Sequence, residues 1–330
     1  MNLKLLAAAG VLALGTAGAN AAAIITNGTI GLGVNNEGHL NLFGGPGIPP
    51  SAGGTAAYGL RDLRTGFEAT APGCLCEGWG ISNGLAGWTA SVDTGGVSVT
   101  LVSFGSTAST ATSVVTAGSV FEVTHAFQPS ASPDLMEVIV TIRNISGGAI
   151  ANTLYRRGMD WDIEPTPFRE YVTIGGTAAA TAVTSAVNNG FCNVNPLFGC
   201  FPILPGGTGD FVDLGPSDHG ANFDFNFGPL ADGASVSFSI FYGASPTQVA
   251  AFNALNAVGA EVFSLGKSSD NLAGTLAGRS IFIFGFKGVG GTVVPPGGVI
   301  PEPGTWAMLI AGFGMVGFAA RRRRAAVATA

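Results

Sequence analysis

Residues 135–145 read L-M-E-V-I-V-T-I-R-N-I, and they form the clearest β-strand pattern of the 330-residue chain. Apolar and polar side chains alternate from Glu137 to Arg143, as in a strand with one buried face, and a Ser146-Gly147-Gly148 turn follows. Similar strand patterns occupy residues 29–34, 39–43, 97–104, 120–127, 222–227, 236–242 and 281–286. Turn dipeptides such as Asn27-Gly28 also recur. The chain is therefore predicted to be all-β and sandwich-like, with one large sandwich or two smaller ones.

One segment departs from this alternation and predicts a short helix. Ser245-Pro246-Thr247-Gln248 provides an N-cap and a first-turn proline, and Gly259 is a plausible end. The expected apolar face consists of Val249, Phe252, Leu255 and Val258. A single helix in an all-β chain fits a sandwich with one covering helix.

The C-terminal residues 299–324 read V-I-P-E-P-G-T-W-A-M-L-I-A-G-F-G-M-V-G-F-A-A-R-R-R-R. The uncharged stretch Trp306–Ala320 would rise about 22 Å as a helix, which is short of the roughly 30 Å hydrocarbon core. Snorkelling arginines make a thin span feasible. We predict a single transmembrane helix, and a buried core helix with a solvated basic tail is the alternative. The residues expected to stop the span on the cytoplasmic side are Arg321, Arg322, Arg323 and Arg324.

Several elements of this tail, in their order, resemble the PEP-CTERM sorting signal of Gram-negative bacteria, in its P-E-P-x-x-W-A-M variant. They are Pro301, Glu302 and Pro303, then Trp306, Ala307 and Met308, then Gly-Phe-Gly at 312–314 and the arginines. The resemblance covers about a tenth of the chain. It implies recognition by exosortase, a membrane-embedded cysteine transpeptidase or protease, with cleavage at or near the tripeptide. It also implies export, and a context of exopolysaccharide or biofilm production.

The N-terminus resembles a secretory signal peptide. Lys4 precedes an apolar run, and Ala19-Asn20-Ala21 matches an A-x-A site, so cleavage is expected after Ala21, or after Ala23 in another register. The Sec machinery and signal peptidase are the implied partners. The predicted organisation is a signal peptide at 1–21, a β-rich ectodomain at 22–287, a Gly/Pro linker at 288–298, the sorting signal at 299–324 and a tail at 325–330. The protein would be held transiently at the inner membrane and then reach the outer surface or the medium.

Charge and composition restrict the function of the exported part. The chain has a formal charge of −6, and removal of five cations, Lys4 and Arg321–Arg324, lowers it to −11. An acidic domain is a poor ligand for nucleic acid, so we expect no nucleic-acid partner.

The three histidines occur in no H-E-x-x-H motif, and neither G-x-S-x-G nor a phosphate-binding loop is present. His125 shares a strand face with Phe121 and Val123 and is expected to be buried with a partner. We therefore predict that the protein is not an enzyme.

The four cysteines are Cys74, Cys76, Cys192 and Cys200, an even number in an exported chain, which favours disulfides. Cys192 and Cys200 flank a short turn-rich loop suited to a local bond. A bond between Cys74 and Cys76 would be strained on an extended strand, so long-range pairing of the two clusters is a competing prediction. A four-thiolate zinc site is a third alternative, although the spacing does not favour it.

The most distinctive polar stretch is Y-R-R-G-M-D-W-D-I-E-P-T-P-F-R at residues 155–169. On a strand, Asp160, Asp162 and Glu164 would share one face, with Trp161 and Ile163 pointing into the core. We expect three arginines to balance these carboxylates, and Ca²⁺ is the alternative. The arginines are Arg156, Arg157 and Arg169. A second acidic stretch around His219 could complete a cation site, with Asp210, Asp213, Asp218 and Asp224.

Two functions fit these features. The first is a noncatalytic surface or extracellular-matrix protein, associated with exopolysaccharide. The alternative is an exported carbohydrate-binding or carbohydrate-active protein that uses Ca²⁺ at the Asp-rich stretch and Trp79, Trp88 or Trp161 as a stacking platform.

Overall fold

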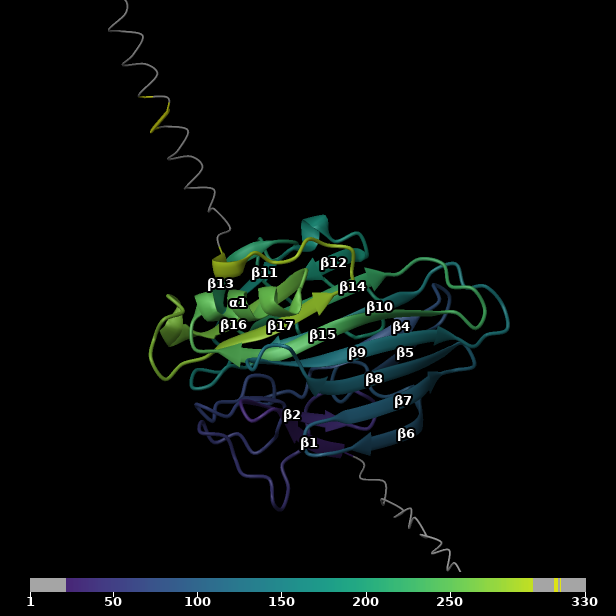
Figure 1. The fold of residues 1–330 in the computed structure, drawn as a ribbon, viewed down its shortest axis with the longest axis horizontal. Coiled ribbons are helices and arrows are strands. Elements are labelled where there is room, and N and C mark those ends of the chain that lie inside the picture. Colours follow the sequence, from purple (N-terminus) through teal and green to yellow (C-terminus); the bar gives the residue numbers. More distant parts are fainter. Residues whose placement is uncertain (1–21, 299–311, 314, 316–330) are drawn as a thin grey trace, which may run out of the picture.

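The computed structural model describes residues 22–298, 312, 313 and 315, and its regular secondary structure is mostly antiparallel sheet (Figure 1). A nine-stranded sheet has the spatial order β13 (Phe211–Ser217), β11 (Glu170–Gly175), β16 (Val262–Ser268), β17 (Ile281–Lys287), β15 (Ser235–Ser245), β9 (Leu135–Asn144), β8 (Phe121–Pro129), β7 (Ala111–Ala117) and β6 (Thr100–Ser106). A five-stranded sheet has the order β12 (Val183–Val187), β14 (His219–Asn226), β10 (Leu154–Trp161), β4 (Gly78–Ser82) and β5 (Gly87–Ser91). A third sheet contains β1 (Ala22–Thr26), β2 (Ile30–Asn35) and β3 (Leu60–Asp62).

The five-stranded sheet packs face to face on the nine-stranded sheet, so the predicted all-β, sandwich-like class is confirmed. Aromatic side chains meet between them: the ring centroids of Phe223 on β14 and Phe286 on β17 are 5.0 Å apart, and those of Tyr155 on β10 and Phe238 on β15 are 5.1 Å apart. Apolar residues of β1–β3 join the same hydrophobic core. Each large sheet contains strands from both the first and the second half of the chain, so the described body forms one sandwich rather than two.

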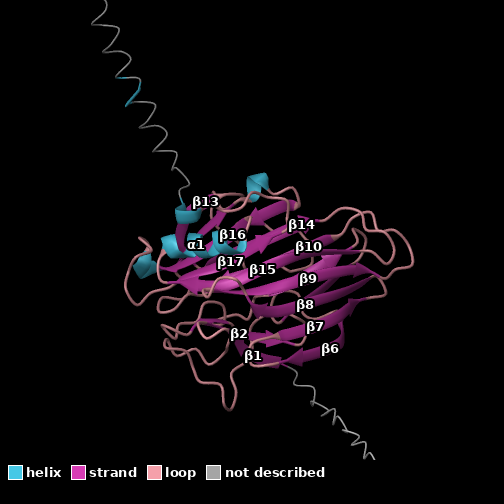
Figure 2. Ribbon diagram, viewed as in Figure 1, coloured by secondary structure: helices cyan, strands magenta, loops and turns pink. Residues whose placement is uncertain are grey.

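The predicted helix is α1 (Gln248–Val258), which covers the other face of the nine-stranded sheet (Figure 1). Thr247 caps it by accepting a hydrogen bond from the Ala250 N–H, and Gly259 ends it with a φ of 70°. The prediction for Val249 is wrong, because 57% of this side chain is exposed. Positions three residues apart are offset by about 60° around the axis of an α-helix. Three such offsets separate Val249 from Val258, so the two side chains point to opposite sides of the helix. Figure 2 shows how little of the fold is helical; the short 3₁₀ turns are Thr177–Ala179, Ser269–Asn271 and Pro296–Gly298.

Residues 288–298, predicted as a Gly/Pro linker between the ectodomain and the sorting signal, form hydrogen bonds to the body, and we call them the C-terminal strap. The Glu261 carboxylate accepts hydrogen bonds from the backbone N–H groups of Gly288, Val289 and Gly291, at 2.9–3.1 Å. The Val289 and Val294 side chains are buried. Glycines without side chains let these backbone N–H groups converge on one carboxylate, which composition does not reveal.

Several predicted segments lie outside the described residues. They are the signal peptide at 1–21, the sorting residues Pro301–Pro303 and Trp306–Met308, and the stop Arg321–Arg324. Within the described part of the chain, no helix has the length and apolar character needed to cross a membrane. The transmembrane helix therefore stays a prediction.

Candidate functional site

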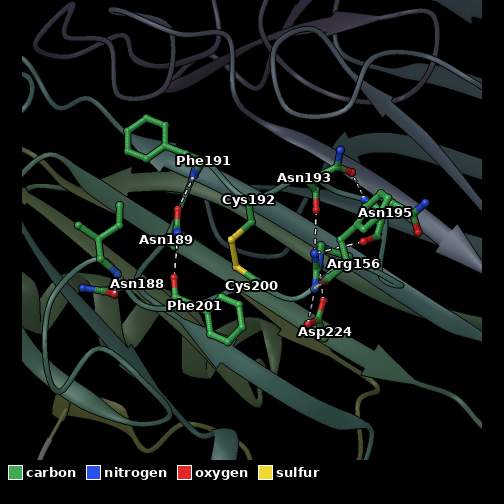
Figure 3. Close-up of a disulfide and its surroundings, with 12 residues drawn as sticks. Arg156, Asn188, Asn189, Phe191, Cys192, Asn193, Asn195, Cys200, Phe201 and Asp224 are labelled. Atoms are coloured by element: carbon green, nitrogen blue, oxygen red, sulfur yellow. Dashed lines mark hydrogen bonds and ion pairs between the residues drawn. A yellow bond between two sulfur atoms is a disulfide. The ribbon is translucent and has the colours of Figure 1, made fainter.

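The outer face of the five-stranded sheet carries the polar residues that the sequence indicated. Strand β10 alternates, so Tyr155, Arg157 and Trp161 point between the sheets, as predicted for Trp161. Arg156 and Asp160 point outward, beneath the loop at residues 188–208. This loop contains the Cys192–Cys200 disulfide and lies across the sheet (Figure 3).

Four acidic residues converge at one end of this face, and we call them the carboxylate cluster: Asp160, Asp162, Glu170 and Asp218. Oxygen atoms of Asp160, Asp162 and Asp218 lie within 4.8 Å of one another. Glu170, the first residue of β11, accepts a hydrogen bond from the Ile163 N–H at 3.1 Å, which places its carboxylate beside Asp162. Asp160, Asp162 and Glu170 are fully or almost fully buried, whereas Asp218, in the turn between β13 and β14, is exposed.

Burial and mutual repulsion dominate the electrostatics of the cluster. Burial, followed by the charge of neighbouring carboxylates, raises the pKa of Asp160 and of Asp162 above the usual range. Burial is also the main cause that raises the pKa of Glu170 to about 9. The buried oxygens without a hydrogen-bond partner are Oδ1 of Asp160, both Oδ atoms of Asp162 and Oε2 of Glu170. No ion pair among the described residues joins a cationic side chain to these carboxyl groups.

The expectation that arginines balance these carboxylates is wrong. Arg156 forms an ion pair with Asp224, and Arg157 forms one with Glu77. Arg169 is exposed, and no ion pair among the described residues joins an arginine to the cluster. The two strand arginines point to opposite faces of β10, so each meets a different acid.

Glu164 does not belong to the cluster, so its predicted place beside Asp160 and Asp162 is a second correction. Its carboxylate accepts hydrogen bonds from the hydroxyls of Ser51 and Thr55, both at 2.5 Å, and from the Glu68 N–H at 2.9 Å. β10 ends at Trp161, so strand alternation no longer sets the direction of Glu164. Its role is to hold the loop at residues 51–55.

Of the second acidic stretch, Asp218 alone joins the cluster. Asp210 accepts hydrogen bonds from Thr177, and Asp213 forms an ion pair with Lys267. His219 is buried, with Nε2 3.2 Å from the Glu170 carbonyl oxygen. Asp218 was predicted as part of the acidic stretch around His219, whereas Glu170 was not predicted because it lies in no acidic run.

Both disulfides are local. Cys74 bonds to Cys76 and Cys192 to Cys200, so the long-range alternative is wrong. The thiols are consumed in these bonds, which leaves none for a four-thiolate zinc site. The Cys74 sulfur lies 3.4 Å from Oδ2 of Asp160, so the first disulfide borders the carboxylate cluster.

The second disulfide belongs to a loop that Arg156 holds against the sheet (Figure 3). The Arg156 guanidinium donates to the carbonyl oxygens of Asn193 at 2.7 Å and Phe198 at 2.9 Å, besides its ion pair with Asp224. The loop exposes apolar side chains to solvent: Phe191, Leu197, Phe198, Phe201 and Ile203. The sequence signal for this apolar surface is the group of three phenylalanines at residues 191–201, F-C-N-V-N-P-L-F-G-C-F, which the sequence analysis did not single out.

The tryptophans proposed as a stacking platform do not form one. Trp79 and Trp161 are completely buried between the sheets, and Trp88 packs edge-on against Phe121. Large aromatic rings on the strands of a sandwich stabilise the fold when they fill the core between the sheets, which explains why these rings are buried.

His125 is buried as predicted, and its Nε2 lies 3.1 Å from the Tyr155 hydroxyl. Burial lowers the pKa of His125 well below its ordinary value, so the ring is neutral. It borders a buried polar network in which Glu77 accepts hydrogen bonds from Arg157 and Tyr242. These groups lie between the sheets and were not singled out by the sequence, apart from Arg157.

Comparison with known proteins supports the interpretation of the tail. Residues 299–324 match the family model described as the PEP-CTERM protein-sorting motif, so the resemblance noted from the sequence is confirmed. No curated protein matches the chain.

A solved structure from Escherichia coli K12, provisionally assigned as an aldose 1-epimerase, aligns with 84% of this chain and 94% of its own. The identity is 10% and the TM-score is 0.29. An enzyme assignment for this neighbour contradicts the prediction that the chain is not an enzyme, and that prediction is withdrawn. At this TM-score the similarity carries no argument about what the present chain does.

Proposed function

We propose that this chain, which carries a PEP-CTERM sorting motif at residues 299–324, is a surface or extracellular-matrix protein that exosortase recognises and cuts. The motif is the observation that carries the proposal, because a sorting signal implies export and membrane-associated processing. The product then reaches the outer surface or the medium, in an exopolysaccharide context.

Two structural features support export and processing. Disulfides form in oxidising compartments, and the described cysteines are all paired. The C-terminal strap forms hydrogen bonds to the body as far as Gly297, whose N–H donates to Asn253 Oδ1 at 3.0 Å. Pro301 follows four residues later, so a cut near the tripeptide removes the tail and keeps the body.

Strand β1 also bears on the signal-peptide site. Its first residue, Ala22, pairs with Asn35, and Ala23 pairs with Val34. Cleavage after Ala21 leaves this strand intact, whereas cleavage after Ala23 removes two of its residues. We therefore favour Ala22 as the mature N-terminus.

Replacement of Pro301-Glu302-Pro303 by three alanines tests the proposal. We expect export to continue and the C-terminal cut to fail, which cell fractionation and mass spectrometry of the C-terminal peptide would show. The matched control replaces Pro295-Pro296 in the strap, which lies outside the motif, and should be processed normally. A tripeptide variant whose mature form still ends near residue 303 would show that exosortase is not the processing enzyme.

A second candidate function, carbohydrate binding, is favoured by the disulfide-bonded loop. A contiguous exposed apolar patch marks interaction surfaces, and aromatic rings provide flat faces for stacking. Phe201 is the most exposed of the loop aromatics. Phe201→Ala should weaken binding on a glycan array by tenfold or more, while Leu85→Ala, an exposed apolar residue elsewhere, should not change it. Absence of binding to any glycan by the wild type would remove this candidate.

A further inference from the structure

The carboxylate cluster assembles acids from three separate parts of the chain. Asp160 lies near the end of β10 and Asp162 directly follows this strand, Glu170 opens β11, and Asp218 occupies the turn before β14. The hydrogen bond from the Ile163 N–H to Glu170 ties two of these segments together. The sheets therefore hold the four side chains in a fixed arrangement, which does not depend on how the tail is processed.

Several carboxylate oxygens of this cluster differ from other buried carboxylate oxygens of the described residues because they lack hydrogen-bond partners. Within the described residues, every buried carboxylate oxygen without a partner belongs to Asp160, Asp162 or Glu170. Elsewhere buried acids are satisfied: Glu77 by Arg157 and Tyr242, and Glu164 by two hydroxyls and the backbone. A buried carboxylate without a partner is costly, and native proteins pair such groups or use them to coordinate metals. The missing partner is a positive charge inside the cluster.

The ligand chemistry indicates which cation. We propose that the carboxylate cluster binds one Ca²⁺ ion, with oxygens of Asp160, Asp162, Glu170 and Asp218 as protein ligands. Ca²⁺ takes six to eight oxygen ligands in a flexible geometry, and water can supply the remainder. Mg²⁺ prefers to keep several waters and one or two carboxylates, so a site with four acids favours Ca²⁺. The neighbouring Cys74–Cys76 disulfide offers no thiolate, which disfavours soft metals.

The accessibility of the cluster fits exchange with solvent. Asp218 is exposed whereas the other three acids are buried, so the ion would enter past Asp218 and be enclosed by the rest. The site itself does not rest on the sorting proposal, because it uses the folded body alone.

Calcium titration of the purified full-length protein tests the site. After EDTA treatment and dialysis, CaCl₂ is added while binding is followed by calorimetric titration and unfolding by thermal denaturation. We expect one Ca²⁺ per chain and a Tm that rises by about 5–11 °C at a concentration 100-fold above Kd. Asp162→Asn should weaken binding at least tenfold. In EDTA the same variant should be as stable as the wild type or more so, because it removes a buried carboxyl group that repels its neighbours and lacks a partner.

The matched control is Asp210→Asn, which alters an acid of the same stretch that is bonded to Thr177 instead. It should bind Ca²⁺ like the wild type. The proposal is overturned by the absence of a Tm change up to about 10 mM CaCl₂, which exceeds the weak end of extracellular sites. Equal affinity of the Asp162→Asn variant overturns it as well. A response to Mg²⁺ as large as that to Ca²⁺, or to Zn²⁺ only after disulfide reduction, would assign a different metal and also refute it.

Discussion

The ion pair between Glu77 and Arg157 offers the sharpest test of how the sandwich is held together. Both side chains are completely buried between the sheets, with Arg157 Nε 2.5 Å from Glu77 Oε1. The same oxygen accepts a hydrogen bond from the Tyr242 hydroxyl at 2.8 Å, and Oε2 accepts one from the Leu40 N–H at 2.5 Å. Glu77→Gln keeps the size of the side chain but removes its charge.

The expected cost follows from the guanidinium left behind. Arg157 keeps the Gly38 carbonyl and the Tyr155 hydroxyl as hydrogen-bond acceptors, and neither carries a charge. Breaking a buried pair by removal of one partner costs about 3–5 kcal/mol. For a body of this size the Tm should fall by roughly 6–20 °C. Equilibrium urea unfolding and calorimetry of the purified protein measure both quantities.

A matched surface pair is the control. Arg143 and Glu122 lie 3.8 Å apart with both side chains substantially exposed, so Glu122→Gln should change the free energy of unfolding by no more than about 0.5 kcal/mol. Adding Arg157→Met to Glu77→Gln should recover part of the loss, because no unpaired charge remains. A Glu77→Gln variant within about 1 kcal/mol of the wild type would refute the reasoning. A double variant less stable than the single one would refute it too.

Three further changes test other parts of the structure. Arg156→Met removes the guanidinium that pairs with Asp224 and holds the disulfide-bonded loop. Limited proteolysis should therefore cut this loop faster in the variant. An unchanged cleavage rate would contradict the role of Arg156. Burial raises the pKa of Glu68 to about 7, so the folded protein keeps a proton that the unfolded chain loses. This stabilisation is complete below about pH 4.5 and disappears as the pH rises through 7. Between pH 5 and 8 the Glu68→Gln variant should therefore lose less stability than the wild type in urea unfolding, and parallel profiles would refute this. Glu261→Gln removes the charge that strengthens the hydrogen bonds to the strap. Hydrogen exchange of the Gly288, Val289 and Gly291 amides should therefore accelerate about tenfold. Unchanged protection of these amides would show that the carboxylate charge is dispensable.

Local signals in the sequence predicted the individual elements well. The alternation in residues 135–145 corresponds to β9, and the Thr247 cap and Gly259 end of α1 lie where turn chemistry placed them. These features depend on neighbouring residues, so one sequence contains the information. Strand alternation gave the wrong direction for the Glu164 side chain, because the strand ends before this residue. A three-residue spacing wrongly placed Val249 on the buried face of the helix.

The arrangement of the site could be predicted only in part. Asp160 and Asp162 lie together as their spacing suggested, but Glu170 and Asp218 join them through packing of β11 and the turn before β14. Likewise Arg156 and Arg157 could not be assigned partners, since Asp224 and Glu77 are distant in sequence. Contacts of this kind depend on strand order in the sheets, which periodicity does not contain.

The intact mass of the mature protein, isolated from cells that export it, tests the central claim most directly. The proposed route predicts a single species that begins at Ala22 and ends at or near Pro301–Pro303, without Arg321–Arg324. A surface or extracellular species whose mass includes residues through Ala330 would contradict the claim that the sorting tail is removed.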